Sequence, residues 1–280
     1  MSWHGKPLSL DLFLQKMKNE YTHLDLFSGI GGFSLAAESV GFRTVAFCER
    51  ESYPIKVLNE RWPGIPIEND IYTLDGTKYR GISLVTGGFP CQPFSIIGKQ
   101  KGKSDNRYLW PEMCRIIYEA QPDWVLGENV VGLDGLALEE CLSDLESINY
   151  EVAPPFEIPA CAVGAWHQRK RIWIIANRIA EKSPDPFNKP SRNGCLGQSR
   201  QPKREIFQSV FNSTNNNYES VYSKIRMEED TFNAEPDLVR MVHGIPLASH
   251  RNKALGNAIV PQLASVILKN IMAIELKKRI

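Results

Sequence analysis

The stretch that decides the fold is residues 22–33, which read THLDLFSGIGGF. Its first half, Thr22 to Phe27, is a short apolar-rich run that is typical of a buried strand. A glycine-rich turn follows, and from Ser34 to Val40 the pattern is helical, with Gly41 placed to end the helix. A strand that enters a helix through such a turn is the opening unit of an α/β sheet.

The same alternation continues outward along the chain. Strands are expected at Arg43 to Cys48, Ile82 to Thr86 and Trp124 to Leu126, in two apolar runs at Val152 to Ile158 and Arg171 to Ala176, and helices at Tyr53 to Arg61, Pro111 to Ala120 and Leu136 to Ile148. Strands that alternate with helices predict an α/β fold with a doubly wound, mostly parallel sheet.

The alternation breaks near Arg178. From there to about Pro236 the chain is rich in Asn, Ser, Pro and basic residues, and helical apolar spacing returns only over 258–278. We therefore expect an α/β domain over 1–177, a small irregular region over 178–250, and a C-terminal segment over 251–280 whose helix returns to the first domain.

Composition limits the class of protein. The 280 residues are 42% hydrophobic and 23% charged, which excludes a disordered or fibrous chain. The net charge of +1 provides no global field for a polyanion, so nucleic-acid binding requires local clusters of charge. The six cysteines are spread along the chain, and no pair has the spacing of a zinc knuckle or a redox dithiol, so no metal site is expected. No apolar run approaches the roughly 18 residues that span a bilayer, and no signal pattern opens the sequence, which favours a cytoplasmic protein without membrane contact.

The glycine-rich turn indicates a nucleoside ligand. Glycines let backbone N–H groups approach a ligand closely. Ser34 stands where the dinucleotide pattern has its third glycine, yet Glu49 ends the second strand twenty residues past Gly29, where an acid can accept from ribose hydroxyls. The pattern therefore favours a ligand with a ribose but without a pyrophosphate.

A second group of polar residues follows the later strands. The strand ending at Thr86 runs into Gly-Gly-Phe-Pro-Cys-Gln-Pro-Phe-Ser over 87–95, where prolines and glycines stiffen the loop around Cys91. The next strand delivers Glu128 to the same edge of the sheet, and a basic run that ends at Arg171 enters the last strand. Cations beside a thiol and a carboxylate can lower the pKa of the thiol or hold an anionic group.

Together these stretches resemble the DNA (cytosine-5) methyltransferases of the bacterial and phage type. In the order of that family, the matching stretches are Asp25–Phe33, Glu49, Asn69–Ile71, Gly88–Ser95, Glu128–Val130, Arg169–Arg171 and Lys253–Pro261. The resemblance covers everything except the first twenty residues and the irregular region, where the chain is short for the family. One departure stands at Trp166 and His167, where the family often has proline and glutamine.

The resemblance implies a Rossmann-like fold that uses S-adenosyl-L-methionine, with 178–250 as the target-recognition region. It implies that the thiolate of Cys91 adds to carbon 6 of a flipped-out cytosine, which lets carbon 5 take the methyl group. Glu128 would hold or protonate ring N3, and Arg169 would hold the ring oxygen or orient Glu128. The group that removes the carbon-5 proton is left open.

The remaining site residues are also implied by the resemblance. The cofactor residues are Phe27, Ser28, Gly29, Ile30, Gly31, Gly32, Phe33, Glu49, Asp70, Ile71, Pro90, Leu109, Asn257 and Ala258. The DNA contacts are Gln92, Ser95, Asn129, Arg171, Lys99 and Lys101, and in the irregular region Arg192, Arg200, Lys203 and Arg204, with Asn215–Asn217 as adenine partners. The implied partner is double-stranded DNA, in restriction–modification or in phage and host DNA protection, with or without a cognate restriction endonuclease.

Three alternatives stay open at this point. The first is the same chemistry on RNA, as in the tRNA-methylating branch of the family. The second is a non-catalytic DNA-binding regulator on the same scaffold, which intact Cys91, Glu128 and Arg169 disfavour. The third is a nicotinamide oxidoreductase, which the missing third glycine and the Pro-Cys loop disfavour.

Overall fold

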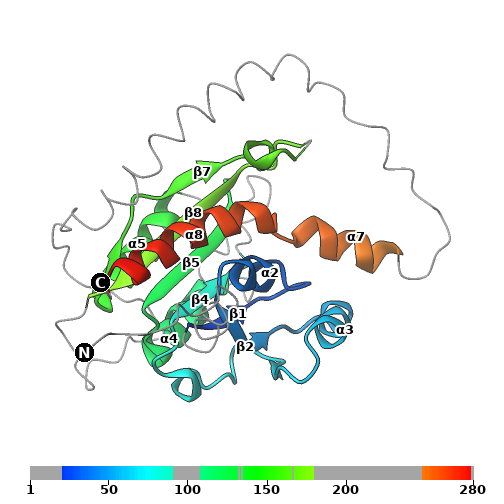
Figure 1. The fold of residues 1–280 in the computed structure, drawn as a ribbon, viewed down its shortest axis with the longest axis horizontal. Coiled ribbons are helices and arrows are strands. Elements are labelled where there is room, and N and C mark those ends of the chain that lie inside the picture. Colours follow the sequence, from blue (N-terminus) through cyan, green and yellow to red (C-terminus); the bar gives the residue numbers. More distant parts are fainter. Residues whose placement is uncertain are drawn as a thin grey trace, which may run out of the picture.

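The computed structural model in Figure 1 describes residues 21–90, 108–131, 133, 135–165, 167–179 and 248–278. Its strands are β1 (Thr22–Leu26), β2 (Arg43–Cys48), β3 (Ile67–Glu68), β4 (Leu84–Gly87), β5 (Trp124–Val130), β6 (Tyr150–Val152), β7 (Phe156–Ile158) and β8 (Arg171–Arg178). Its helices are α2 (Gly32–Ser39), α3 (Ser52–Arg61), α4 (Trp110–Ala120), α5 (Gly135–Ser147), α7 (Ala248–Asn257) and α8 (Pro261–Lys277), with the 3₁₀ turns η1 (Gly76–Tyr79) and η3 (Ala160–Val163).

The strands form one sheet in the order β3-β2-β1-β4-β5-β8-β6, with β7 also paired to β8. The first five of these strands are parallel, whereas β8 runs antiparallel to β5, β6 and β7. The predicted doubly wound, mostly parallel α/β fold is therefore confirmed. The apolar run predicted over 152–158 is two short strands, because Pro154 and Pro155 between them cannot donate to a strand ladder.

The order of the strands places the ligand edge. From β1 the sheet first grows through β2 to β3, and the chain then crosses back so that β4 lies on the other side of β1. In such sheets ligands bind at the carboxyl ends of the strands beside this switch point. The segments that follow β1, β2, β4 and β5 all begin at that edge.

Helices cover both faces of the sheet (Figure 1). On one face α2 and α8 pack together, with Phe33, Ala37, Leu263 and Ile267 in a common buried cluster. On the other face, α4 and α5 pack against β1, β4 and β5. Their buried side chains form a second cluster around Trp110 and Met113. One face is thus closed by an early and a late helix, and the other face by two helices from the middle of the chain.

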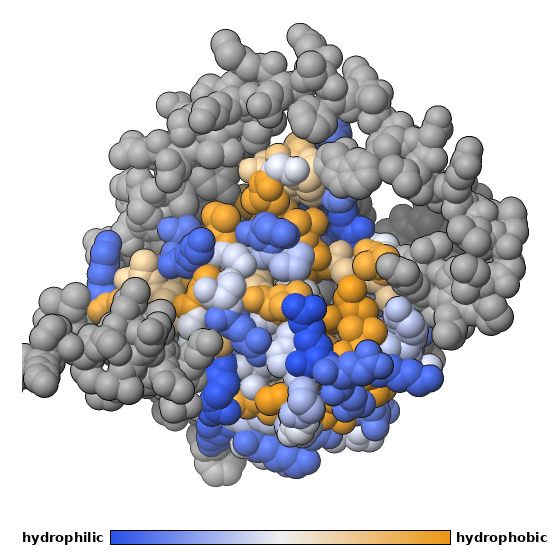
Figure 2. Space-filling model, turned by 45° about the vertical axis from the view of Figure 1, so that its right-hand side comes forward, coloured by the Kyte–Doolittle hydropathy of each residue, from blue (hydrophilic) through white to orange (hydrophobic). Residues whose placement is uncertain are grey.

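The run Lys253–Lys277 contains an 18-residue window with a mean hydropathy of 1.5, so it is long and apolar enough to cross a membrane by length and composition alone. Within it, α8 buries Leu263, Leu268 and Ile271 against the sheet and α2. A helix whose apolar stripe packs in this way belongs to the core of the domain. On the face of the molecule in Figure 2, hydrophilic and hydrophobic residues are mixed rather than gathered by kind.

The predicted helices and strands agree with the structure to within a few residues. Two elements were not predicted: β3, which has only two residues, and α7, whose sequence ASHRNKALGN has no apolar stripe. Residues 1–20, 91–107 and 180–247 lie outside the described residues, and most of the predicted irregular region is among them. α7 begins inside the range 178–250 predicted for that region.

Candidate active site

A cavity of about 820 Å³ opens at the carboxyl edge of the sheet. Its wall runs from Gly29 and Glu49, after β1 and β2, through Asp70 to Gly88 and Glu128, at β4 and β5. This volume lies in the range of small-molecule and cofactor sites, roughly 300–1,000 Å³. Groups from segments that are distant in the chain therefore face one space.

Each glycine of the first turn is required for a different structural reason. Gly29 has φ +53° and lines the cavity, and a Cβ there would meet nothing within 4 Å. Gly31 has φ +83°, and a Cβ on it would collide with the Trp62 ring. A Cβ on Gly32 would lie 2.8 Å from Cγ1 of Ile259, in the connection to α8. Packing accounts for Gly31 and Gly32, whereas Gly29 leaves the cavity open to a ligand.

Glu49 links the ends of β1 and β2. Its Oε2 accepts from the backbone N–H of Gly29 at 2.7 Å, and its Oε1 accepts from the N–H groups of Arg50 and Glu51, both at 2.7 Å. These bonds fix a carboxylate on the cavity wall, and Oε2, which accepts only one of them, retains a lone pair for a further donor. The arrangement suits an acceptor of ribose hydroxyls.

A buried polar network lies in the sheet behind the turn. His23 on β1 contacts Thr44 Oγ1 through Nδ1 at 3.1 Å and Thr86 Oγ1 through Nε2 at 2.8 Å. Thr86 in turn donates to Asp25 Oδ1 at 3.2 Å, and Ser34 donates to Asp25 Oδ2 at 2.8 Å. All five side chains are buried. Ser34, in the place of the third glycine, is therefore a partner of the Asp25 carboxylate.

Burial shifts the two titratable groups of this network in opposite directions. Desolvation lowers the pKa of His23 to about 3, so the imidazole is neutral. Desolvation also raises the pKa of Asp25 to about 7, although the hydroxyls of Ser34 and Thr86 oppose it by donating to the carboxylate. When Asp25 is ionised, Thr86 donates to it and accepts from His23 Nε2–H, which leaves Nδ1 to accept from Thr44.

Glu128 is the carboxylate on the opposite wall of the cavity. Its side chain is 10% exposed, and its Oε1 lies 2.8 Å from Nε of Arg171. Its Oε2 lies 3.2 Å from where a Cβ on Gly88 would stand, so a side chain at 88 would press on the carboxyl group. Burial raises the pKa of Glu128, and the charges of Arg171 and Arg169 partly oppose this rise.

The two arginines have different environments. The sequence predicts that Arg169 holds a ring oxygen or orients Glu128, but the ion pair with Glu128 is made by Arg171, the first residue of β8. Arg169 precedes the strand with φ +29°, and its Nη2 donates to the carbonyl of Ala258 at 2.8 Å. Among the described residues, nothing accepts from its buried Nε.

Asn129, predicted as a DNA contact, is engaged with the backbone. Its Nδ2 donates to the carbonyl of Phe89 at 3.0 Å, and its Oδ1 accepts from the N–H of Val130 at 2.8 Å. Phe89 also packs its ring against Trp110, with the centroids 5.1 Å apart. These contacts fix the bend that carries Pro90 to the cavity wall.

The structure brings together part of the predicted cofactor set. The predicted residues that line the cavity are Phe27, Gly29, Glu49, Asp70, Ile71, Pro90, Leu109 and Asn257, together with Glu128, Asn129, Arg169 and Arg171. Predicted cofactor residues outside its wall are Ser28, Ile30, Gly31, Gly32, Phe33 and Ala258. Ser28 donates through Oγ to the carbonyl of Asp25, and Phe33 is buried edge-on against Trp173, so their side chains serve the core.

Sequence reasoning missed several residues of the wall. Those outside both the predicted site residues and the matching stretches are Cys48, Arg50, Glu51, Tyr53, Pro54 and Tyr72. Arg50 and Tyr72 directly follow the predicted residues Glu49 and Ile71, and that adjacency is the signal that could have found them. Burial raises the pKa of the Cys48 thiol to about 12, so this thiol stays protonated near neutral pH.

The other predicted site residues lie outside the described residues. These are Cys91, Gln92, Ser95, Lys99, Lys101, Arg192, Arg200, Lys203 and Arg204, with Asn215–Asn217. Within the described ranges, no group of three or more His, Cys, Asp or Glu side chains is arranged to hold a metal ion.

Comparison with known proteins extends this picture. A family model described as C-5 cytosine-specific DNA methylase matches residues 21–240 of the 280. The Type II methyltransferase M.PspPI of Psychrobacter sp. is 36% identical over 182 residues, which cover 60% of this chain and 44% of that protein. M.Eco47II of Escherichia coli, also a Type II methyltransferase, is 34% identical, with 61% and 44% covered. The chain thus spans less than half the length of these curated relatives.

Solved structures support the fold. The crystal structure of a Spodoptera frugiperda DNMT2 mutant matches with a TM-score of 0.57 at 18% identity, and the match covers 89% of this chain and 99% of that one. The S. pombe Dnmt2 methyltransferase matches with a TM-score of 0.56 at 17% identity, over 91% and 99%. At these identities the likeness shows a shared architecture.

Proposed function

Because the chain belongs to the C-5 cytosine-specific DNA methylase family, we propose that it methylates carbon 5 of cytosine in double-stranded DNA. One observation carries the proposal beyond family membership. The same cavity is lined by the Glu49 and Asp70 side, which suits a nucleoside cofactor, and by Glu128 with its arginines, which suits a pyrimidine ring. A methyl donor and its acceptor can therefore meet in one space.

S-adenosyl-L-methionine is the cofactor of this family, and when bound it supplies an electrophilic methyl group. The residues present fit it. Glu49 would accept from the ribose hydroxyls, and Gly29 leaves room for the methionine part of the cofactor. Asp70 accepts from the N–H of Tyr72 through Oδ1, so Oδ2 can accept from the adenine amine beside Ile71.

On the other wall, the chain's own groups would activate the base. We assign Cys91 as the nucleophile: its thiolate forms a bond to carbon 6, and the electrons of the 5,6 double bond move to make carbon 5 nucleophilic. Negative charge that spreads to N3 would be met by Glu128, whose raised pKa favours a form that donates a proton or a hydrogen bond. After methylation, loss of the carbon-5 proton allows the bond to Cys91 to break and regenerates the thiolate.

The arginines complete this wall. Arg171 holds Glu128 in place through its ion pair, which makes it the orienting residue. The buried Nε of Arg169, which has no acceptor within the described part of the chain, supports a contact with the ring oxygen, because an unpaired buried donor is costly. Because the groups of the cavity cannot reach carbon 5 of a base that is stacked in a duplex, the cytosine would be flipped into the cavity.

Target choice is assigned to the region 178–250, between the catalytic domain over 1–177 and the C-terminal segment over 251–280. Its Arg192, Arg200, Lys203 and Arg204 would contact guanine edges or phosphates. Single alanine variants on a randomised duplex pool at two salt concentrations separate these roles, because a phosphate contact lowers the salt slope and a base contact changes preference at one position. Unchanged preferences in every variant would move the assignment to the loop after Cys91.

The names of the relatives support a biological setting for this activity. Their Type II names favour a restriction–modification role, with a cognate endonuclease that need not touch this chain, or a protective role for phage or host DNA. Such an enzyme would work in the bacterial cytoplasm, at the nucleoid. Sequencing 5-methylcytosine in host DNA with and without the protein tests this setting.

The decisive experiment measures transfer of a labelled methyl group to duplex DNA and to RNA. Wild-type protein should label DNA, and a duplex with 5-fluorocytosine should trap it covalently, because fluorine cannot leave as a proton does. Cys91→Ala should lose transfer and trapping yet still bind S-adenosyl-L-methionine. Normal turnover by Cys91→Ala would reject the nucleophile, and labelling of RNA alone would reject the substrate.

A further inference from the structure

The turn after β3 carries Asp70 and Ile71, two residues of the proposed adenine wall. The carbonyl of Asp70 accepts from the N–H groups of Thr73 at 3.2 Å and Leu74 at 3.1 Å, so the turn closes on itself. Ile71 and Leu74 are buried, but Tyr72 between them is 49% exposed. Ile71 and Leu74 therefore anchor the turn in the core, and the direction of its backbone depends on what its carbonyls contact.

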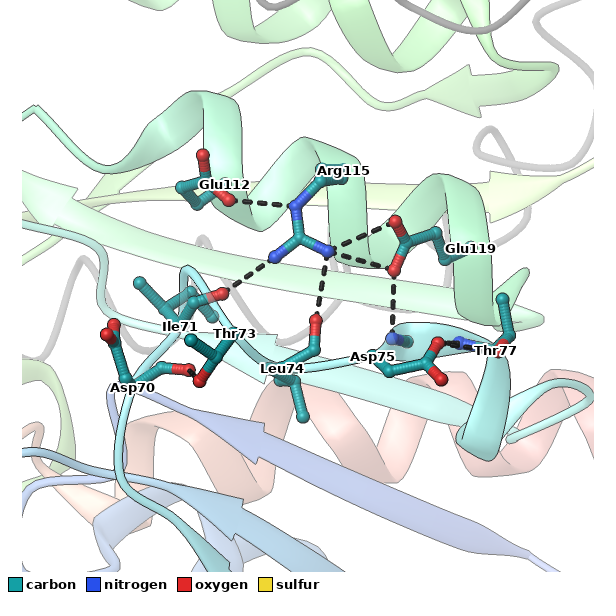
Figure 3. A network of polar contacts seen from close by, with 10 residues as sticks. Asp70, Ile71, Thr73, Leu74, Asp75, Thr77, Glu112, Arg115 and Glu119 are labelled. Atoms are coloured by element: carbon teal, nitrogen blue, oxygen red, sulfur yellow. Dashed lines mark hydrogen bonds and ion pairs between the residues drawn. The ribbon is translucent and has the colours of Figure 1, made fainter.

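Arg115 of α4 connects this turn to the domain (Figure 3). Its Nη2 donates to the carbonyl of Ile71 at 2.7 Å, and its Nη1 donates to the carbonyl of Leu74 at 3.0 Å. A planar guanidinium can hold two acceptors in fixed directions at once, which the single ammonium of lysine cannot do. Both ends of the turn are thus bound to one side chain.

Two carboxylates on α4 keep this guanidinium oriented. Nε of Arg115 donates to Glu112 at 2.8 Å, and Nη1 donates to Glu119 at 2.9 Å. Burial lowers the pKa of Arg115, but the hydrogen bonds and charges of the two glutamates outweigh burial and raise it overall. Glu119 also accepts from the N–H of Gly76 at 2.9 Å, so the carboxylate that orients Arg115 also holds the start of η1.

α4 itself is firmly anchored. Trp110, Met113 and Ile116 are buried in the core at 1% exposure or less. At the start of the helix, the N–H of Leu109 donates to the carbonyl of Pro90 at 3.2 Å, directly before Cys91 in the chain. The support that holds the adenine side of the cavity is therefore also bonded to the segment that leads to the proposed nucleophile.

We infer that Arg115 is a positioning residue for adenine recognition: it holds the carbonyls of Ile71 and Leu74 and so fixes the Asp70–Ile71 wall. The inference rests on the function proposed above. Arg115 is not part of the cavity wall, so it acts through the turn. Losing it should relax the wall and weaken the distinction between adenine and a base without the 6-amino group.

The test compares two ligands by calorimetry. S-adenosylhomocysteine carries the amine, and S-inosylhomocysteine carries an oxygen in its place. The variants are Arg115→Met, which keeps an aliphatic side chain but no donor, and Arg115→Lys, which keeps the positive charge but not the planar set of donors. Arg178→Met is the matched control, because Arg178 pairs with Asp123 at 2.8 Å at the opposite edge of the sheet. Thermal unfolding of each variant checks that it is folded at the temperature of the titration.

Wild-type protein should prefer S-adenosylhomocysteine by about tenfold, the effect of roughly one hydrogen bond. In Arg115→Met this ratio should fall toward one, with Arg115→Lys between, whereas Arg178→Met should keep the wild-type ratio even if it is less stable. If Arg115→Met keeps the wild-type ratio of the two affinities, the inference is overturned. If Arg115→Met does not fold, an unchanged ratio in Arg115→Lys overturns it. Wild-type protein that binds both ligands equally also overturns it but leaves the function standing, and wild-type protein that binds neither rejects the proposed function itself.

Discussion

Asp25 and Glu128 are two buried carboxylates at the same edge of one sheet, yet their surroundings differ in kind. Asp25 is fully buried and takes two hydroxyl donors, with a neutral histidine beyond them. Glu128 faces the cavity, pairs with Arg171, and has its second oxygen over Gly88. Burial raises the pKa of both. The difference is that the protein occupies both oxygens of Asp25, whereas a ligand can reach Glu128. Burial with a raised pKa is therefore a sign of chemistry only where the group also faces a space.

The largest expected effect separates the two groups by activity. Glu128→Ala should lower kcat/KM by about 10²- to 10⁴-fold, the range for a group that transfers a proton in the transition state. Glu128→Gln should lose less, since the amide can still donate to N3. Asp25→Asn should keep most of its activity per folded molecule, because the hydroxyls around it can turn to accept. Steady-state kinetics on a cytosine duplex provides the comparison, and equal losses for Ala and Gln would show that ionisation matters more than donation.

The second prediction concerns stability and pH. Asp25 holds its proton up to about pH 7 when folded but only to its usual value near 4 when unfolded, so its contribution to stability falls as pH rises through that window. His23 loses its proton above about pH 3 when folded but near 6.5 when unfolded, so its contribution rises with pH. Between about pH 4 and 6.5 the two slopes oppose each other.

Removing either group should expose the slope of the other. Relative to wild type, the free energy of unfolding of Asp25→Asn should rise with pH, and that of His23→Gln should fall, each by up to about 1.4 kcal/mol per pH unit. Urea unfolding at pH 4.5, 5.5 and 6.5 measures these differences. Parallel curves for the three proteins would mean that the network does not titrate as its burial requires.

The third prediction sharpens the role of the ion pair at Glu128. Arg171→Leu should destabilise the protein by about 1–3 kcal/mol, because it leaves a mostly buried carboxylate without its partner. The double variant Arg171→Leu with Glu128→Leu should cost less than the sum of the single variants. Arg169→Leu combined with Glu128→Leu should be closer to additive, and equal coupling for the two arginines would reject the distinction between them.

The smallest effect belongs to Ser34. Ser34→Ala removes one donor to Asp25 and should cost about 1 kcal/mol of stability, while kcat should stay near the wild-type value. Loss of that donor should also raise the pKa of Asp25 further, so the decline in stability with pH should extend to higher pH. Ser34→Gly, which restores the third glycine of the dinucleotide pattern, is the matched variant. A gain in stability from Ser34→Gly would show that the serine is not a structural partner.

The sequence predicts the order of the elements because each strand and helix carries its own apolar period. It also predicts twelve of the 25 residues that line the cavity, because the topology brings the ends of parallel strands to one edge and the resemblance marks residues there. It does not reveal that His23 meets Thr44, or that Asp25 meets Thr86, because those pairs depend on the register between strands distant in the chain. Arg115 is missed for a similar reason: on α4 it reads as one charge on a solvated face, and only the packing of α4 places it over the turn.

The choice between Arg169 and Arg171 shows the same limit at closer range. Both stand in one basic run, and the resemblance alone favoured Arg169. The structure separates them because β8 begins at Arg171, which starts the pairing with β5 and so lies beside Glu128. A difference of two positions in the sequence therefore determines which arginine pairs with Glu128.

The packing of α8 on α2 also bears on how this scaffold can change in evolution. β8 ends at Arg178 and α7 begins at Ala248, and the packing of α8 on α2 holds the later part of the chain in the same domain, so both ends of the stretch between them belong to one domain. The entropy of closing a flexible loop grows only with the logarithm of its length, and doubling the length costs about 0.6 kcal/mol. Changes in the length of this stretch would therefore cost little stability, and under the function proposed above target choice could diverge while the rest of the domain stays unchanged.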